Sequence, residues 1–405
     1  MATITKRTRR RPGREPLTTF VAWYVDQDGR RRNKTFATKK EARAWLDRTV
    51  IEVADGVHTP SSDSITVAEA GELWIAQGRT DGLEASTLMQ YGQHLDLHIK
   101  PFIGRIKLAE PKPAHLQSLR DRLFAADRSR DMVKRVIVSL GAILAAAMSY
   151  GKLARNIVRD QARNRATRER RLAGRHKEKL VVGVDIPTKD EIRAMLAAAR
   201  GFWRPLIVTA IFTGLRASEL RGLTWDDVDL EAEILTVRRR ADRWNTIGSP
   251  KSDAGKRVVP LAPFVVNTLK EWKLACPNGP ARLVFPSGKG NVENITILHR
   301  SVLGPLQLAA GITSVAAIRG QQPELTEKAA ARVARRHPKY GLHALRHAAA
   351  SLFIEDGWSV KRVQSVMGHS SVRVTLDTYG HLFPDPDEDK AAMRRLQARL
   401  VGGTS

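Results

Sequence analysis

The side chains with the clearest chemical potential are cations, imidazoles and a phenol spread over the last half of the chain. They are Arg216, Lys251, His343, Arg346, His369 and Tyr379. Arg216 stands in an otherwise apolar segment just after a glycine, and His343 and Arg346 lie one helical turn apart, so they share a helix face. Guanidinium groups suit paired hydrogen bonds to an oxyanion, and a phenol can act as a nucleophile. We therefore consider these residues together as one candidate site.

Each residue also has a structural interpretation when taken alone. Arg216 could form an ion pair with Glu219, and Lys251 could be an ordinary loop lysine. His369 could cap a helix, and Tyr379 could be a core residue whose hydroxyl has a hydrogen-bond partner. Two further histidines, His347 and His381, are interpreted as structural.

Several other chemistries lack their residues. The chain has no phosphate-cradling G-x-x-x-x-G-K-[ST] loop and no G-x-S-x-G nucleophile turn. His343 and His347 have the i, i+4 spacing of a zinc helix, but Ala344 occupies the position of the glutamate base and Arg346 would lie beside the dication. The single cysteine, Cys276, excludes a disulfide within the chain. We predict no metal and no cofactor.

Charge is the strongest compositional signal. The 405 residues carry a net charge of +26, with a sequence pI near 10.7. Such an excess favours a polyanionic partner, either nucleic acid or an anionic membrane surface. No run of about 18 apolar residues is present, and the N-terminus lacks the apolar stretch of a signal peptide. A nucleic-acid-binding protein of a reducing compartment is the resulting expectation, without membrane partners.

Residues 1–62 are predicted to form a β-ribbon followed by a helix. Residues 20–25 and 30–36 resemble strands joined at Asp28-Gly29, and a capping box begins a helix at Thr38. Residues 1–40 contain 12 Lys and Arg against 3 acids, so this unit is predicted to bind DNA. A solvated extension or an import signal would explain the charge equally simply. The predicted DNA contacts are Lys6, Arg7, Arg9, Arg10, Arg11, Arg30, Arg31 and Arg32.

Three further regions follow. Residues 63–160 show helical periodicity and predict a helical bundle. Residues 161–187 are a basic linker that either lies on a phosphate backbone, through Arg163, Arg165 and Arg168, or is an ordinary solvated hinge. Residues 188–405 predict an α-rich domain with a small sheet, in which residues 234–240 and 256–261 pair as strands. The fold class is therefore multidomain and mainly α, with small β-sheets.

In residues 188–405 the sequence resembles the tyrosine recombinase, or phage integrase, family. The resemblance is carried by T-G-L-R-A-S-E-L around Arg216, Lys251 ahead of R-V-V-P-L, H-A-L-R ending at Arg346, M-G-H-S-S around His369 and T-L-D-T-Y-G-H-L-F around Tyr379. These motifs occur in the family's order and at its usual intervals. The middle region resembles the family's helical core-binding domain, and the N-terminal ribbon resembles an arm-site-binding domain. Residues 304–340 match nothing in the family pattern, and Ala344 and Ala348-Ala349 depart from it.

The resemblance implies a transfer of DNA phosphodiesters. Arg216 and Arg346 would bind the non-bridging oxygens, and Tyr379 would attack the phosphorus to give a 3′-phosphotyrosyl link. A dense cationic pocket is expected to favour the phenolate, with His343 as proton acceptor. Lys251 would protonate the leaving 5′ oxygen. His369 would donate a hydrogen bond to the phosphate, and one phosphoester replaces another without ATP or metal.

The implied function is a site-specific integrase that integrates and excises phage or mobile-element DNA. The expected partners are double-stranded DNA with core and arm attachment sites, a homotetramer on that DNA, a host DNA-bending protein and an excision or directionality factor. A C-terminal helix at residues 387–400 would dock on a neighbouring protomer or pack on its own domain. The implied location is the cytoplasm of a bacterial host, at the nucleoid. Two alternatives stay open: a type IB topoisomerase and a DNA-binding architectural protein.

Overall fold

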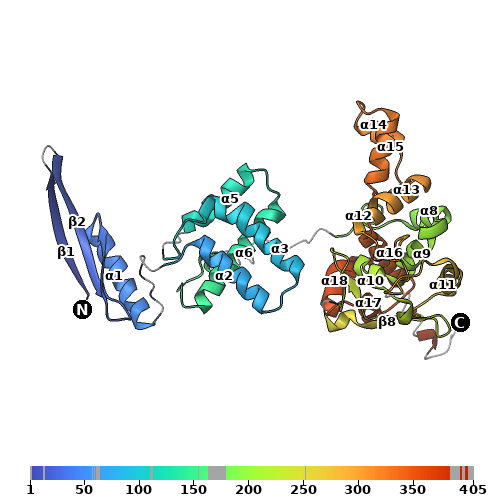
Figure 1. Ribbon diagram of the computed structural model, residues 1–405, viewed down its shortest axis with the longest axis horizontal. Coiled ribbons are helices and arrows are strands. Elements are labelled where there is room, and N and C mark those ends of the chain that lie inside the picture. Colours follow the sequence, from blue (N-terminus) through green and yellow to red (C-terminus); the bar gives the residue numbers. More distant parts are fainter. Residues whose placement is uncertain are drawn as a thin grey trace. The chain divides into compact units, whose positions relative to one another are not determined.

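The chain forms two compact units, Met1–Arg175 and His176–Ser405, which are described separately. The computed structural model describes residues 2–11, 14–56, 58, 60, 64–109, 113–153, 155–162, 179–250, 252–383, 393–394 and 397–399. Helices dominate both units, and the sheets are small and antiparallel (Figure 1). This confirms the predicted fold class.

The first unit begins with a three-stranded sheet of order β1-β2-β3, followed by a helix. Its elements are β1 (Thr3–Arg11), β2 (Arg14–Val25), β3 (Arg31–Phe36) and α1 (Lys39–Ala54). Ala22 and Tyr24 of β2 pack with Leu46 of α1 in a small core. The predicted turn is present: the Asp26 carboxylate accepts hydrogen bonds from the backbone N–H groups of Asp28 and Arg30. Strand β1 was not among the two strands that the sequence predicted, and it carries the basic residues within positions 6–11.

A helical bundle follows in the same unit. It contains α2 (Val67–Thr80), α3 (Ala85–His94), the π-helix η1 (Leu95–Ile99), α4 (Lys100–Ile103), α5 (Pro113–Ala125) and α6 (Arg130–Ser149). Among the described helices, α6 alone is long and apolar enough to cross a membrane by length and composition. Val136, Leu140 and Ile143 of this helix pack in the bundle core, which accounts for its apolar character.

The capping box predicted at Thr38 is present, and the same T-x-x-E pattern forms capping boxes at Thr66 and Thr188. At Thr38, Thr66 and Thr188 the hydroxyl accepts a hydrogen bond from a backbone N–H three residues on. A glutamate at that third position in turn accepts from the threonine's own N–H. These reciprocal bonds satisfy N–H groups that a helix start would otherwise leave without partners. They fix the first residues of α1, α2 and α8.

The second unit surrounds a mostly buried helix, α9, on which α16 and α11 pack. Residues 234–237 and 257–260 pair antiparallel, as predicted. The elements as far as this sheet are α8 (Lys189–Ala198), η2 (Gly201–Trp203), α9 (Arg204–Thr213), α10 (Ala217–Gly222), η3 (Trp225–Asp227), β4 (Val228–Asp229), β5 (Ile234–Val237), β6 (Arg240–Ala241), β7 (Ile247–Gly248), η4 (Asp253–Gly255) and β8 (Arg257–Pro260).

The rest of this unit is helical. Its elements are α11 (Pro263–Ala275), α12 (Ile295–Ile297), η5 (Leu298–Leu303), α13 (Gly304–Ala309), α14 (Val315–Gln321), α15 (Glu327–Arg336), α16 (Leu342–Glu355), α17 (Val360–Met367), α18 (Val372–Tyr379) and η6 (Gly380–Leu382). The hairpin of α14 and α15 projects from the rest of the unit (Figure 1). Of the predicted C-terminal helix, residues 393–394 and 397–399 are described and are helical; its other residues lie outside the described part.

Candidate active site

Two glycines place backbone carbonyls at the centre of the second unit. Gly214 ends α9 with φ +62°, and Gly368 ends α17 with φ +63°, a left-handed conformation that glycine adopts readily. A Cβ on Gly214 would lie 2.7 Å from the Met367 sulfur. The chain therefore turns sharply at both points, and each carbonyl accepts a hydrogen bond from an arginine of the candidate site.

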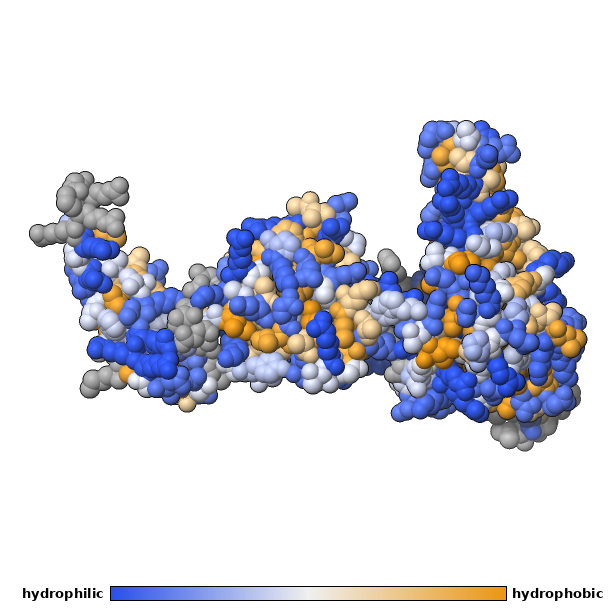
Figure 2. Space-filling model, viewed as in Figure 1, coloured by the Kyte–Doolittle hydropathy of each residue, from blue (hydrophilic) through white to orange (hydrophobic). Residues whose placement is uncertain are grey.

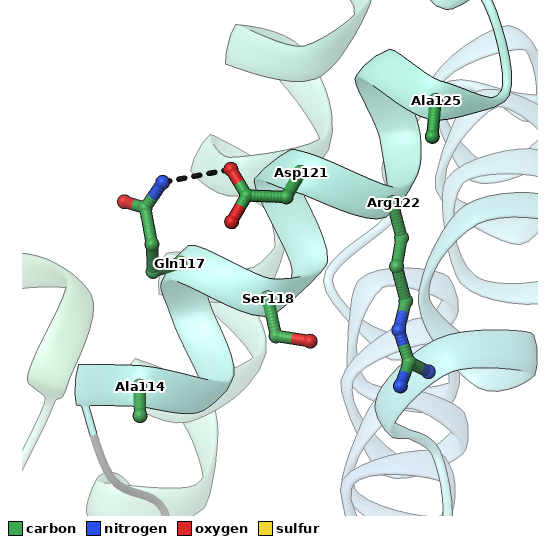
Figure 3. Close-up of a pocket in the computed structure, with 6 residues that line it drawn as sticks. All are labelled: Ala114, Gln117, Ser118, Asp121, Arg122 and Ala125. Atoms are coloured by element: carbon green, nitrogen blue, oxygen red, sulfur yellow. Dashed lines mark hydrogen bonds between the residues drawn. The ribbon is translucent and has the colours of Figure 1, made fainter.

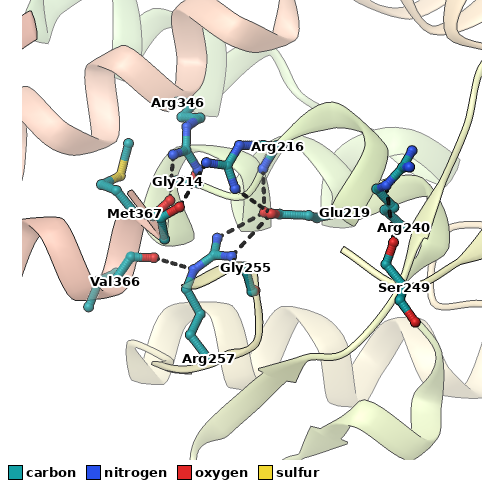
Figure 4. A network of polar contacts seen from close by, with 11 residues as sticks. Gly214, Arg216, Glu219, Arg240, Ser249, Gly255, Arg257, Arg346, Val366 and Met367 are labelled. Atoms are coloured by element: carbon teal, nitrogen blue, oxygen red, sulfur yellow. Dashed lines mark hydrogen bonds and ion pairs between the residues drawn. The ribbon is translucent and has the colours of Figure 1, made fainter. Parts of the chain in front are cut away.

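A buried carboxylate joins two arginines in this centre (Figure 4). The Glu219 side chain, 3% exposed, accepts hydrogen bonds from Arg216 Nη1 at 2.8 Å and from Arg257 Nη2 at 2.8 Å. Arg216 also donates to the Gly368 carbonyl at 2.9 Å. Burial alone would raise the pKa of Glu219, but the hydrogen bonds and charges of the two arginines hold that pKa below its usual value. The ion pair considered for Arg216 is thus present, together with a second arginine.

Arg346 lies beside this cluster but is held by carbonyls. Its side chain, 2% exposed, donates from Nη1 to the Gly214 carbonyl at 2.6 Å and from Nη2 to the Met367 carbonyl. Burial, followed by the charge of Arg216, lowers the pKa of Arg346 to about 9. The group therefore stays charged at neutral pH and is fixed in direction, as a preorganised oxyanion donor requires.

Tyr379, at the end of α18, is buried with 1% exposure. Its hydroxyl shares a hydrogen bond of 2.7 Å with His347 Nδ1, and its ring lies 6.1 Å from the His369 ring, centroid to centroid. Burial raises the pKa of Tyr379 to about 12, although the charges of Arg346 and Arg216 act to lower it. The cationic neighbours thus favour the phenolate, as expected, but in this conformation desolvation outweighs their charge and the phenol is protonated.

Two imidazoles, those of His347 and His369, lie beside the phenol, and a third, that of His343, packs on His347. His369 Nδ1 is 2.9 Å from the Thr375 hydroxyl, and the His343 ring packs edge-on against the His347 ring at 4.5 Å. Burial is the main cause that lowers the pKa of each of these histidines, to about 4 for His347 and His369. All three are therefore neutral at pH 7, and their uncharged rings can each offer one donor and one acceptor.

The structure brings together five of the six predicted site residues, and Lys251 lies outside the described residues. Two participants were missed. His347 was interpreted as structural, yet it contacts the hydroxyl of the candidate nucleophile. Arg257 was passed over, although it occupies a buried position of the alternating strand β8, where an arginine needs a charged partner. That alternation was the available signal for Arg257, whereas the contact of His347 depends on how α16 meets α18.

The predicted DNA contacts of the first unit divide between the two faces of its sheet. Ala22 and Tyr24 face α1, so Trp23 lies on the opposite, open face, with the Arg31 guanidinium 4.8 Å from its ring. Arg7 and Arg9 alternate onto this open face through their pairing with β2.

The remaining predicted contacts have other positions. Lys6 and Arg30 are exposed, while Arg32 is engaged by Asp26 at 2.8 Å and braces the turn instead. Arg10 and Arg11 belong to β1, and the structure describes their backbone only. The linker residues Arg163, Arg165 and Arg168 lie outside the described residues.

The helical bundle carries a hollow on its surface. An open hollow along α5 is lined by Ala114, Gln117, Ser118, Asp121, Arg122 and Ala125 (Figure 3). Gln117 Nε2 donates to Asp121 at 2.8 Å there. Within the described residues, no cluster of three or more His, Cys, Asp or Glu could hold a metal ion. The arginine, histidine and tyrosine cluster is therefore the candidate site.

Fold and site together define a protein with the tyrosine recombinase architecture. Residues 187–385 match the model of the phage integrase family, and residues 66–124 match the phage integrase N-terminal SAM-like domain. The chain is 23% identical to a tyrosine recombinase XerC-like protein of Caldanaerobacter subterraneus, covering 92% of this chain and 94% of that protein. It is 26% identical to an integrase of Streptomyces ambofaciens, over 84% of this chain and 82% of that one. The chain belongs to the phage integrase family.

Solved structures agree on the fold. The Tn1549 transposon integrase in complex with circular intermediate DNA matches with a TM-score of 0.61 and 21% identity, covering 82% of this chain and all of that one. A lambda integrase dimer bound to a core site matches with a TM-score of 0.55 and 16% identity, covering 90% of this chain and 92% of that one.

Proposed function

We propose that this chain cleaves and rejoins DNA at specific sites with Tyr379 as its nucleophile, and so integrates and excises phage or mobile-element DNA. Site-specific recombination by a tyrosine recombinase is the activity of its family. What supports the residue assignment is one observation. Arg216, Arg346, His369 and Tyr379 come from four separate helices or turns and meet at one buried centre.

The proposed step conserves one phosphoester bond. The Tyr379 oxygen attacks phosphorus, the bond from phosphorus to the 5′ oxygen breaks, and the DNA strand becomes joined through its 3′ phosphate to the phenol. Arg216 and Arg346 would neutralise the charge that builds on the non-bridging oxygens, and each such fixed donor is worth about 3–4 kcal/mol of barrier. The reverse attack by the 5′ hydroxyl of another strand exchanges partners.

Proton transfer is assigned to His343 and Lys251, and hydrogen bonding to two further histidines. His343 would accept the phenolic proton, and Lys251 would protonate the leaving 5′ oxygen. His347 would hold the hydroxyl in its protonated form until the phosphate arrives, since its Nδ1 lies 2.7 Å from that hydroxyl. His369, fixed through Nδ1 by Thr375, would direct its other ring nitrogen to the phosphate.

Domain roles follow the same reasoning. Residues 1–62 would bind arm-type sites through the open face of the sheet, residues 63–160 would bind the core site, residues 161–187 would link them on the phosphate backbone, and residues 188–405 would carry the chemistry. DNA binding and multimeric assembly are properties of the family; a lambda integrase tetramer has been solved on a Holliday junction. For this chain we propose a homotetramer with exchange of the C-terminal helix, helped by a host DNA-bending protein and a directionality factor.

The alternative activities are not favoured. A type IB topoisomerase would relax supercoils without strand exchange, and an architectural protein would not need the aligned arginines. The family and the relatives matched over most of the chain are recombinases and integrases. We propose action at the nucleoid of a bacterial cytoplasm.

A suicide substrate nicked next to the exchange point tests the nucleophile. The wild-type protein should trap a covalent adduct, and Tyr379→Phe should trap none. Tyr340→Phe is the matched control, because Tyr340 is equally buried and also has a bound hydroxyl, which donates to Glu191 at 2.8 Å. An adduct formed by Tyr379→Phe would refute the assignment, and the absence of an adduct from wild type on its own site would refute the function.

A further inference from the structure

The hairpin of α14 and α15 lies within residues 304–340, for which the family resemblance gave no role. Residues 312–339 contain six Lys or Arg against two acids. The two helices pack on each other, and α15 also packs on α13 and η5 at the base of the projection (Figure 1). The hairpin is therefore a basic projection built onto the domain that carries the candidate site.

The base of this hairpin is fixed rather than loosely attached. Tyr340, which follows α15, is buried and exchanges two hydrogen bonds with the buried Gln307, at 2.7 and 2.9 Å. Lys339 forms an ion pair with Glu191 at 2.8 Å, and the Tyr340 hydroxyl donates to the same carboxylate. A Cβ on Gly304 would lie 1.8 Å from the Arg335 carbonyl, so α15 packs there at backbone distance.

Basic side chains form one stripe along α15. They are Lys328, Arg332, Arg335 and Arg336, which we call the α15 stripe. Positions i, i+4, i+7 and i+8 lie on one helix face, and all four residues are exposed. Ala330 and Ala334 on the other face are buried. No ion pair joins any residue of the stripe to another part of the chain that the structure describes, and Figure 2 shows strongly hydrophilic residues along the projection.

We propose that the α15 stripe binds the phosphate backbone of DNA, as a contact in addition to those at the candidate site. This inference rests on the proposed function, which supplies the ligand. The stripe covers eight residues of rise, or about 12 Å at 1.5 Å per residue. One strand of B-DNA carries a phosphate about every 3.4 Å along its axis, so the stripe spans three to four phosphates.

Other binding partners fit the stripe less well than DNA. A second copy of this chain, with a net charge of +26, offers no excess of acids to pair with it. A membrane surface would require an apolar face beside the basic one, but the alanine face of α15 is already packed within the domain. DNA needs only the exposed charges.

The test neutralises the stripe in the full-length protein. In the variant Lys328→Gln, Arg332→Gln, Arg335→Gln and Arg336→Gln, glutamine preserves helix propensity while removing four charges. The matched control removes four exposed lysines elsewhere in the same unit: Lys270→Gln, Lys273→Gln, Lys289→Gln and Lys361→Gln. Equilibrium binding to a core-site duplex is measured from 0.05 to 0.3 M salt, and hydroxyl-radical footprints are recorded. Circular dichroism melts check that both variants fold.

The stripe variant should reduce the slope of log Kd against log salt by about 0.9 for each lost contact, hence by roughly 3. It should also expose a run of phosphates that wild type and the control protect. An unchanged slope with an unchanged footprint overturns the inference, and so does an equal loss in the control. Loss of assembly on DNA, with the slope and footprint retained, would assign the stripe to a protein contact instead. Adduct formation by wild type on the same DNA shows separately whether the proposed function stands.

Discussion

The cluster around Glu219 and the open face of the N-terminal sheet are both strongly basic, but they hold their charges differently. In the cluster, Arg257 and Arg346 are buried, and their hydrogen bonds to backbone carbonyls fix the orientation of each guanidinium group. On the sheet, Arg7 and Arg9 are exposed and Arg31 leans on Trp23. Buried charges are fixed in direction and suit chemistry at one phosphate, whereas exposed charges give adaptable, salt-sensitive binding. We therefore expect changes in the sheet to affect integration between DNA sites, and changes in the cluster to affect the stability of the second unit.

Deleting residues 1–60 should have the largest effect on the overall reaction. Integration between two sites should be abolished, since the sheet would supply the second DNA contact, while cleavage of a core-site suicide substrate should persist because the cluster is intact. Both are measured with the same protein preparation. Integration by the truncated chain would refute the two-site role of the sheet.

Glu219→Gln should lower the unfolding free energy of the second unit by about 3–5 kcal/mol, because it leaves the buried Arg257 without its carboxylate. Thermal and urea unfolding measure the effect. The control is Glu231→Gln, whose carboxylate pairs with Lys270 at the surface at 3.8 Å and should matter little. Equal effects for the two variants would show that burial does not distinguish the cluster.

His347→Phe should remove the partner of the buried Tyr379 hydroxyl, at a cost of about 1–3 kcal/mol. In the double variant with Tyr379→Phe this cost should largely vanish, since no hydroxyl is left unsatisfied. A double-mutant cycle of unfolding free energies measures the coupling. Strict additivity of the two substitutions would mean that the hydrogen bond contributes nothing to the fold.

Mild acidification should produce the smallest effect. The folded-state pKa of His347 and of His369 is about 4, below the ordinary 6.5, so between these values the unfolded chain binds more protons. Stability is therefore complete above pH 6.5 and decreases as pH falls towards 4. Between pH 6.5 and 6 the two rings together should cost about 1 kcal/mol, which lowers the Tm of a domain of this size by roughly 2–4 °C.

His347→Phe should weaken this pH dependence, whereas His381→Gln should leave it unchanged. His381 serves as the control because it contacts only the Leu180 carbonyl among its described hydrogen-bond partners. A Tm that rises between pH 6.5 and 5 would contradict the buried, neutral state of the two rings.

Local signals in the sequence predicted much of this fold. The three capping boxes lie where Thr38, Thr66 and Thr188 indicated, since each depends on residues three positions apart. The pairing of β5 with β8 followed from alternation. Strand β1 was missed because its basic residues line both faces and leave no apolar alternation.

Sequence motifs predicted which residue types make up the candidate site, but they did not predict which of these residues contact one another. The partnership of His347 with Tyr379 and of Arg257 with Glu219 joins residues 32 and 38 positions apart. Such contacts depend on tertiary packing, which no local pattern contains. For the same reason the net shift in the pKa of Tyr379 was not predictable: the cationic neighbours that lower it can be inferred from sequence, whereas the desolvation that raises it follows from burial.

Arg216 and Arg257 bind the carboxylate of Glu219 at the centre of the second unit, and the Arg346 guanidinium lies within range of its charge. Among the described residues this cluster therefore carries an excess of positive charge in a poorly hydrated place, which does not by itself favour the folded state. A phosphate ester bound there would balance that charge. Substrate binding should therefore stabilise the second unit, and the DNA-bound protein should be its most rigid form.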